Sequence, residues 1–208
     1  MITLEKLRKF FLSLQSIYND KKLYLSELDS AIGDGDHGVN MARGFDAVIN
    51  DLNAKPPVDL EGVFKSVSMS LIKTVGGASG PLYGTFFRKM SLAAGKKNEI
   101  GLDEWIDGMS KGIEGIVQLG KAQKGDKTML DALFPALEAL KAQKDAGKDL
   151  ADALSASAKA AQEGAISTIP LIAKKGRASY LGERSAGHQD PGATSSAMLL
   201  QAAADTLS

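Results

Sequence analysis

Hydrophobic residues recur every three or four positions along most of this chain, a spacing typical of helices with one buried face. Leu7, Phe11 and Leu14 show it near the N-terminus, and Asn19 and Asp20 mark a point where the first helix can break. No segment shows the sustained alternation of a half-buried strand. The pattern predicts an all-α protein with eight helices, at residues 3–29, 38–53, 60–75, 81–95, 102–119, 128–144, 149–173 and from 193 onward.

Residues that start or stop helices support these boundaries. Pro56 ends the second predicted helix, Asp59 can cap the third, and Pro81 suits the first turn of the fourth. Gly120 ends the fifth helix, and Pro135 is expected to kink the sixth. The third and sixth helices have the most continuous apolar faces, so we expect them to lie at the centre of the fold.

The links between these helices are of two kinds. Four combine glycine with polar or charged residues, and they cover residues 29–37, 75–80, 120–127 and 174–192. The other three carry ordinary loop residues, and they cover residues 54–59, 96–101 and 145–148. Short links favour antiparallel neighbours in an up-down bundle or ring, in which alternate links lie at the same end. We therefore expect the four glycine-rich links to meet at one end and form one composite site.

The composition fits a single domain over residues 1–208, long enough to bury a core. Its 25 basic and 25 acidic residues balance, which indicates neither a nucleic-acid partner nor a membrane surface. The absence of cysteine excludes disulfides and thiolate metal sites. The N-terminal segment is too charged for a signal peptide, and no apolar run is long enough to span a membrane. A cytoplasmic protein is expected.

The first glycine-rich link carries Asp29, Asp34 and Asp36 within eight residues. Carboxylate oxygens around a tight turn suit Mg²⁺ or Ca²⁺, and glycines let the backbone curl so that the carboxylates converge. The spacing does not match an EF-hand, since Val39 and Phe45 stand where that loop needs Gly and Glu. A solvated turn is the alternative, but the three other special links favour a metal site.

The other links carry the chemistry of anion binding. Residues 76–80, with Ser79, resemble a backbone anion site at a helix N-terminus, although tight helix packing is an alternative. "GKAQKGDKT" nearly matches a P-loop, but an aspartate is inserted and no strand precedes it. Arg177 in the long last link can pair with a phosphate. His37 and His188 are interpreted as polar contacts or proton carriers, since two histidines are too few for a histidine metal site.

Four segments together resemble one family: "GDGDHGVNM", "VGGASGPLYGTFF", "KGDKTMLD" and "KGRASYLGERSAGHQDPGATS". They are similar to the ADP-binding L subunits of bacterial dihydroxyacetone kinases, and the resemblance covers nearly the whole chain. It implies a closed up-down barrel of eight antiparallel helices with the nucleotide at one rim. The resemblance places Mg²⁺, two ions in all, on Asp29, Asp34 and Asp36. It places nucleotide contacts on His37, Gly38, Val39, Asn40, Ala78, Ser79, Gly120, Met129, Arg177, Asp190, Pro191 and Gly192.

The resemblance also implies a reaction and partners. In this family ADP is held as a cofactor and rephosphorylated by the phosphohistidine-carrying M subunit of the phosphotransferase system. The γ-phosphate, held as ATP, then passes to dihydroxyacetone bound on the separate K subunit. No residue here looks like a substrate nucleophile, which fits a half-enzyme completed by partners.

Other functions remain open from the sequence. One is a kinase subunit that exchanges ADP for ATP; a fusion with the K domain does not fit the chain length. Another is a nucleotide-binding module that contacts a transcription regulator. A helical scaffold leaves the four special links unexplained. The long link should be mobile without nucleotide, because Tyr180 and Leu181 are its few apolar anchors and Arg177 lacks a phosphate partner.

Overall fold

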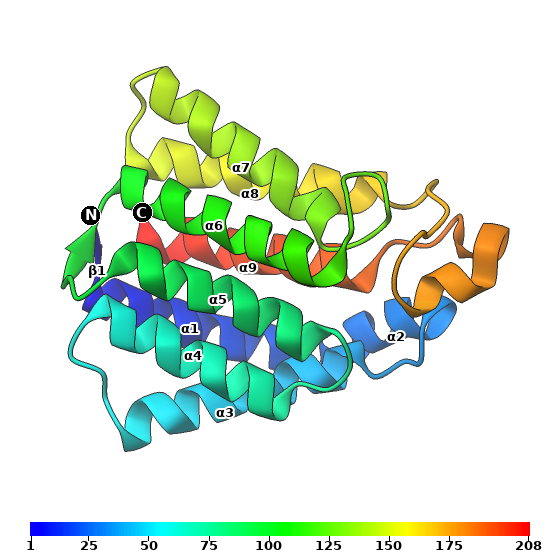
Figure 1. The fold of residues 1–208 in the computed structure, drawn as a ribbon, viewed down its shortest axis with the longest axis horizontal. Coiled ribbons are helices and arrows are strands. Elements are labelled where there is room, and N and C mark those ends of the chain that lie inside the picture. The colour runs from blue at the N-terminus through cyan, green and yellow to red at the C-terminus, as the bar shows by residue number, and fades with distance from the viewer.

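A computed structural model describes all 208 residues and consists almost entirely of helices (Figure 1). The α-helices are α1 Leu4–Asp20, α2 Lys22–Ile32, α3 His37–Ala54, α4 Leu60–Thr74, α5 Ser79–Ala94, α6 Leu102–Gly120, α7 Leu130–Asp145, α8 Leu150–Ser167 and α9 Pro191–Leu207. A 3-10 helix, η1, spans Arg177–Ser185. Two short antiparallel strands, β1 Ile2–Thr3 and β2 Glu99–Ile100, pair beside the N-terminus. The all-α prediction is confirmed.

The helix boundaries differ from the sequence-based ones in two places. The predicted helix 3–29 is two helices, α1 and α2, which meet at Lys21 beside the expected break. The predicted helix 149–173 was too long, because α8 ends at Ser167. Pro170 gives the physical reason, since a proline disfavours helical backbone at the residue before it.

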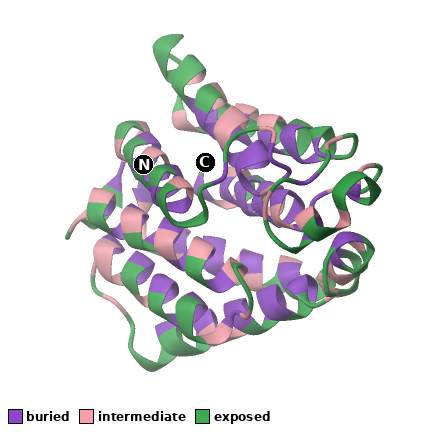
Figure 2. Cartoon of the chain, turned by 45° about the vertical axis from the view of Figure 1, so that its right-hand side comes forward, coloured by how far each residue is buried: buried purple, intermediate pink, exposed green.

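Neighbouring helices contact one another in chain order. α1, α3, α4, α5, α6, α7, α8 and α9 each contact the next, and α9 contacts α1. This order of neighbours favours the closed up-down barrel, which stays an interpretation. One cluster of 48 buried hydrophobic residues fills the interior, and Figure 2 shows the buried faces of the helices turned inward. Phe11 packs edge-on against both Phe64 and Phe87 at its centre.

The most buried helix is α9, not the helices that the apolar pattern favoured. Eleven of its residues are buried, against seven in α4 and seven in α7. Alanine and serine supply most of the difference, since small side chains let a helix approach its neighbours on several sides. An apolar-face pattern does not register such residues, so the predicted central position of α4 and α7 was wrong.

The links lie at the two ends of the molecule as expected. In Figure 1 both termini and the links α3–α4, α5–α6 and α7–α8 lie at the left-hand end. The links α2–α3, α4–α5 and α6–α7 and the segment between α8 and α9 lie toward the right-hand end. Alternation of an up-down fold therefore brings four segments that are far apart in the sequence to one end.

Candidate functional site: an acidic pocket at one end of the helices

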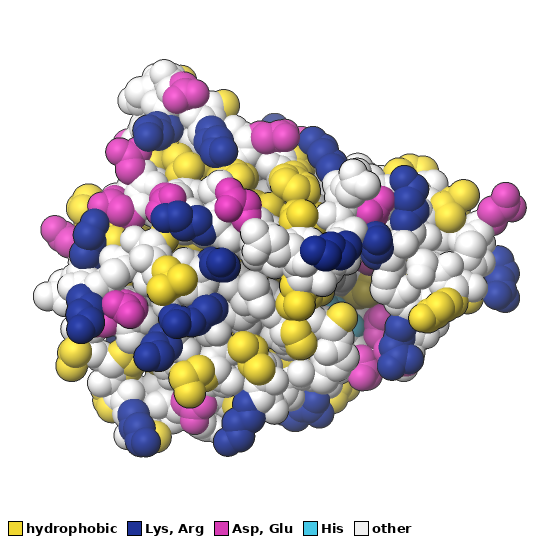
Figure 3. All heavy atoms as spheres, in the orientation of Figure 1, with side chains coloured by type: hydrophobic (Ala, Val, Ile, Leu, Met, Phe, Trp, Pro, Cys, Tyr) yellow, Lys and Arg dark blue, Asp and Glu magenta, His cyan; other side chains and the backbone are white.

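A pocket of about 270 Å³ opens where the four glycine-rich links meet. Its walls come from the α2–α3 link, the N-terminus of α5, the α6–α7 link and the segment between α8 and α9. Figure 3 shows a hollow at this end, with basic residues along its upper edge, acidic residues beside another basic one along its lower edge, and a histidine inside it. The composite site expected from the order of the links is present.

Three carboxylates gather on one side of the pocket. Asp29, Asp34 and Asp36 each offer an oxygen, and these oxygens lie within 4.8 Å of one another. Asp29 lies near the end of α2 and is buried, and it accepts a hydrogen bond from the backbone N–H of His37 at 3.1 Å. Burial raises the pKa of Asp29. Gly35, at φ +78°, lets the link curl between the two exposed aspartates.

This donor set fits a hard divalent cation. Three carboxylates at such short separations repel one another, and oxygen donors are what Mg²⁺ and Ca²⁺ prefer. A positively charged side chain already lies beside these carboxylates, since Arg177 Nη2 is 2.9 Å from Asp34 Oδ2. Because both side chains are partly exposed, this ion pair contributes little to stability, and a phosphate can replace the carboxylate as the arginine's partner.

The N-terminus of α5 faces the same pocket. Gly76, Gly77, Ala78 and Ser79 line it, and Ala78 in the N-cap position gives no side-chain acceptor to the first turn. The first N–H groups of a helix have no partner within the helix, and the helix dipole adds positive potential there. This side of the pocket therefore suits an anion such as a phosphate.

A chain of hydrogen bonds runs from Ser79 on the anion side through His37 to Ser195 and Tyr83. Ser79 Oγ lies 3.2 Å from His37 Nδ1, and His37 Nε2 lies 2.9 Å from Ser195 Oγ. Ser195 Oγ lies 2.7 Å from the Tyr83 hydroxyl, which also contacts Ser196. Burial lowers the pKa of His37 to about 4 and raises that of Tyr83 to about 12. Both side chains are therefore uncharged at neutral pH, and His37 fixes the position of the Ser79 hydroxyl.

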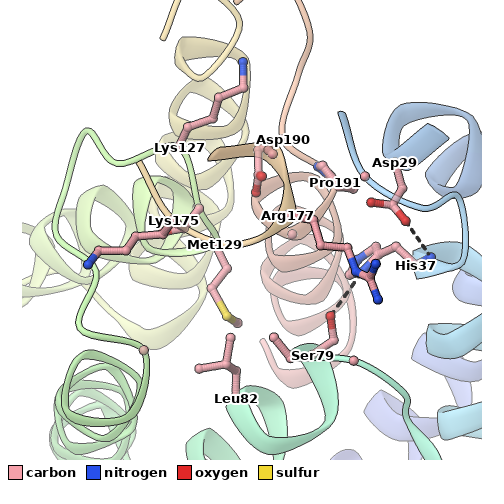
Figure 4. A pocket seen from close by; sticks show the side chains of 18 of the residues that line it. Asp29, His37, Ser79, Leu82, Lys127, Met129, Lys175, Arg177, Asp190 and Pro191 are labelled. Atoms are coloured by element: carbon pink, nitrogen blue, oxygen red, sulfur yellow. Dashed lines mark hydrogen bonds between the residues drawn. The ribbon is translucent and has the colours of Figure 1, made fainter. Parts of the chain in front are cut away.

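The remaining wall is apolar. Met129 and Leu82 point toward each other from opposite sides in Figure 4, and Ile116 and Ala122 line the pocket near them. An apolar wall opposite a few polar groups is the usual make-up of a site for a small organic ligand. The pocket thus combines an apolar wall with surroundings that suit an anion and a divalent cation.

Most residues named from the sequence line this pocket. They are Asp29, Asp34, Asp36, His37, Ala78, Ser79, Gly120, Met129, Arg177, Asp190, Pro191 and Gly192. Their contacts with a nucleotide stay predictions, but their convergence is observed.

Three of the named residues do not line the pocket. A Cβ at Gly38 would overlap the Lys22 carbonyl, so this glycine is explained by close packing of α3 on α2. Val39 is 46% exposed on the outer side of α3. Asn40 is buried behind the backbone of Gly76.

Other pocket residues were missed or misplaced. Leu82 lines the apolar wall, and Ser195 holds His37, although neither stands in a link. Lys127, noted only for its near match to a P-loop, is buried beside the pocket. Tyr180 does not anchor the long link, because it is 88% exposed; Leu181 alone of that pair packs on a small apolar cluster. Contacts between residues that are 40 or more positions apart leave no recognisable pattern in either stretch of the sequence.

The fold and the pocket define an all-α protein with an acidic, glycine-rich site, and sequence comparison gives its family. Residues 31–205 match the DAK2 domain, so the chain belongs to that family. No helix of the chain is long and apolar enough to cross a membrane.

Its relatives include named kinase subunits. The ADP-binding subunit DhaL of the PEP-dependent dihydroxyacetone kinase from Escherichia coli (strain K12) is 44% identical over 185 residues, covering 89% of this chain and 88% of that protein. The corresponding subunit of the PTS-dependent enzyme from Lactococcus lactis is 43% identical and covers 96% and 93%.

A solved structure has the same fold. The dihydroxyacetone kinase from C. freundii in complex with AMP-PNP and Mg²⁺ matches with a TM-score of 0.69 and 27% identity over 98% of this chain. The present chain spans about a third of that longer one.

Proposed function

We propose that this chain is the ADP-binding subunit of a PEP-dependent dihydroxyacetone kinase. The observation that carries the proposal is the meeting of three carboxylates and the open N-terminus of α5 across one pocket with an apolar wall. Relatives that match almost end to end and are named as such subunits support it. The chain then acts as one cytoplasmic nucleotide-binding domain over residues 1–208.

Each wall has a role in holding Mg²⁺ and ADP. Asp29, Asp34 and Asp36 hold Mg²⁺, for which we propose two ions. Ser79 and the first N–H groups of α5 bind phosphate oxygens. Met129 and the apolar residues near it bind the adenine ring. Bound Mg²⁺ would supply charge neutralisation for the phosphates.

The chain contributes positioning and electrostatics to phosphoryl transfer. Such transfer needs little covalent help from protein, so no side chain of the pocket has to act as a nucleophile. His37, held by Ser195, keeps the Ser79 hydroxyl directed at the anion site. Arg177 leaves Asp34 for a phosphate oxygen and excludes water from the site. The phosphohistidine-carrying M subunit would rephosphorylate the nucleotide, and the K subunit would present dihydroxyacetone.

The test begins with the bound nucleotide. Purified protein is denatured, and the released nucleotide is identified and quantified by chromatography. About one ADP per chain is expected. Phosphoenolpyruvate, the general phosphotransferase proteins and the M subunit should then convert that ADP to ATP, and dihydroxyacetone phosphate should form only when the K subunit is added.

Three outcomes would redirect or contradict the proposal. Excess unlabelled ADP should not dilute a labelled bound nucleotide during turnover; rapid dilution would favour the subunit that exchanges ADP for ATP. A chain that binds no nucleotide with Mg²⁺ present would contradict the proposal altogether. Nucleotide binding without phosphoryl transfer would favour a regulatory module that contacts a transcription regulator.

A further inference from the structure

Lys127 is a buried lysine in an unusual setting. It stands in the α6–α7 link with φ +62°, and only 1% of it is exposed. Its ε-ammonium contacts five backbone carbonyl oxygens, those of Thr168 at 2.9 Å, Ile169 at 3.4 Å, Leu171 at 3.1 Å, Ser185 at 2.7 Å and His188 at 2.5 Å. No carboxylate forms an ion pair with it; backbone oxygens are its direct partners, and the carboxyl group of Asp190 acts on it from beyond ion-pairing distance.

These carbonyls belong to the two ends of one segment, residues 168–190, which we call the strap. Three lie just after the end of α8, and two lie at or just after the end of η1. One ammonium group thus holds the residues just after α8 beside those at and just after the end of η1.

Other bonds join the same two ends of the strap, a junction that we call the neck. Gly187 N–H donates to the Ile169 carbonyl at 2.7 Å, and Ala173 N–H donates to Ser185 Oγ at 2.9 Å. Lys174 N–H donates to the carbonyl of Asp126, the residue before Lys127. The α6–α7 link and the strap are therefore joined at both ends of the strap, although they are 40 to 60 residues apart in the sequence.

The strap carries one wall of the pocket. Lys175, Gly176, Arg177 and Ala178 line the pocket from its middle, and Arg177 reaches Asp34 on the opposite wall. In Figure 4 the Lys127 side chain points away from the pocket, toward the neck rather than toward a ligand. Lys127 therefore acts on the pocket through the strap.

We propose that Lys127 is a positioning residue, a built-in monovalent cation that holds the two ends of the strap together and so keeps the nucleotide in the pocket. This inference rests on the proposed function, because it explains how that pocket retains ADP as a cofactor. A cluster of carbonyl oxygens can also accept hydrogen bonds from a free alkylammonium ion. A chain without the lysine side chain should accept such an ion in its place.

The experiment uses Lys127→Ala in the full chain. The removed atoms correspond to propylammonium, so this ion can be tested as a replacement. The readout is the dissociation rate of a fluorescent ADP analogue with Mg²⁺, measured by competition with unlabelled ADP. Cleavage by an arginine-specific protease after Arg177 and Arg184 reports the strap directly. Lys124→Ala, which removes an exposed lysine of the same link, is the matched control.

We expect Lys127→Ala to release the nucleotide at least tenfold faster and to be cut faster in the strap. Propylammonium should restore most of both losses, while propanol, of the same size and uncharged, should not. Lys124→Ala should behave as wild type. An unchanged dissociation rate would overturn the inference, and so would a loss that propylammonium does not repair.

A second variant covers the case in which Lys127→Ala does not fold. Ser185→Ala keeps the lysine but removes the hydroxyl that accepts the Ala173 N–H in the neck. It should release the analogue at least threefold faster, with no response to propylammonium; an unchanged rate would overturn the role of the neck. Wild type that fails to bind the analogue would count against the proposed function itself, whereas normal wild-type binding with unaffected variants counts only against this inference.

Discussion

The three aspartates of the candidate metal site lie in different surroundings. Asp29 is buried and accepts a backbone N–H, Asp34 pairs with Arg177, and Asp36 is exposed with no side-chain partner. Asp36 occupies the N-cap position of α3, but its side chain makes no capping bond. A change at Asp36 therefore tests the metal site with little effect on the helix that follows.

Asp36→Asn removes one charge of the cluster and keeps the shape of the side chain. We expect the affinity for ADP with Mg²⁺ to fall at least tenfold and phosphoryl transfer to be lost, because fewer anionic oxygens hold the cation. Asp34→Asn should lose affinity to a similar degree. Calorimetric titration measures the binding, with the helical circular dichroism signal as the control for folding. Wild-type affinity in both variants would show that the cluster holds no metal needed for nucleotide binding.

Asp190 is expected to make the stability of the folded protein depend on pH. It caps α9 by accepting the Ala193 N–H, and burial raises its pKa to about 7, with Asp131 and Asp29 adding to the rise and Lys127 opposing it. The folded state therefore binds a proton more tightly than the unfolded state. The contribution of this group to stability is full below pH 4 and is lost as the pH rises toward 7.

Asp190→Asn keeps a capping oxygen but does not titrate. We expect its free energy of unfolding to decline less than that of wild type between pH 4 and pH 8, by an amount on the order of 4 kcal/mol, since one pKa unit corresponds to about 1.4 kcal/mol. Urea unfolding at several pH values, with EDTA and without nucleotide, measures the difference. Parallel pH profiles for the two proteins would contradict the raised pKa.

The role of a pocket residue could be predicted from the sequence only where its partners stand within a few positions of it. Asp34 and Asp36 stand beside the glycine that makes their turn, so their chemistry is visible in a few residues of sequence. Lys127 gives no such signal, because its five partners are backbone carbonyls 41 to 61 residues away. Gly38 is the opposite case: it belongs to the conspicuous motif, but packing against α2 explains it.

At the scale of elements, α7 and α8 set the position of the link that carries Lys127. A Cβ at Gly164 in α8 would overlap the carbonyl oxygen of Asp131, at the start of α7. Asp131 in turn accepts the N–H groups of Gly125 and Thr128 through its two carboxylate oxygens. Close packing of the two helices is thereby coupled to the shape of the α6–α7 link.

Gly164→Ala should destabilise the protein by about 1–3 kcal/mol, the usual effect of inserting a carbon into a close contact. It should also weaken ADP binding, since the first turn of α7 must shift along with the link. Glu163→Ala, one position away on the exposed side of α8, is the control and should stay within about 0.5 kcal/mol of wild type. Chemical unfolding and nucleotide titration provide the two readouts. If Gly164→Ala matched its control in both, the coupling would be wrong.

Seven of the nine α-helices follow from the spacing of apolar residues and from Pro and Gly at their ends. The remaining errors have tertiary causes. Asn19 and Asp20 marked a possible break, but the apolar spacing resumes after them, so one helix was predicted where the chain forms α1 and α2. The helix η1 has few apolar positions, so periodicity gives no sign of it. Hydrogen bonds from Lys127 to backbone carbonyls, rather than a buried face, hold the strap in place. Periodicity detects buried faces and cannot detect such bonds.

For the whole molecule, ligand binding should be visible as stability. Four segments meet at the pocket, and they lie between helices from α2 to α9. A ligand that bridges them favours the folded state over the unfolded state by mass action, by about 4 kcal/mol at a thousandfold excess over its dissociation constant. For a chain of this length such a gain corresponds to a rise in Tm of roughly 10 °C.

Because binding raises stability, the Tm can show whether Mg²⁺ bridges the nucleotide and the three carboxylates. Protein stripped of nucleotide should melt at a much higher temperature with Mg²⁺ and ADP together than with either one added separately. The reason is that the phosphates and the three carboxylates repel one another unless a cation lies between them. Differential scanning calorimetry measures the shift, with Asp36→Asn as a protein whose Tm should rise less at the same ligand concentrations. Equal protection by ADP in EDTA would mean that the nucleotide binds without the metal, and the carboxylate cluster would then need another explanation.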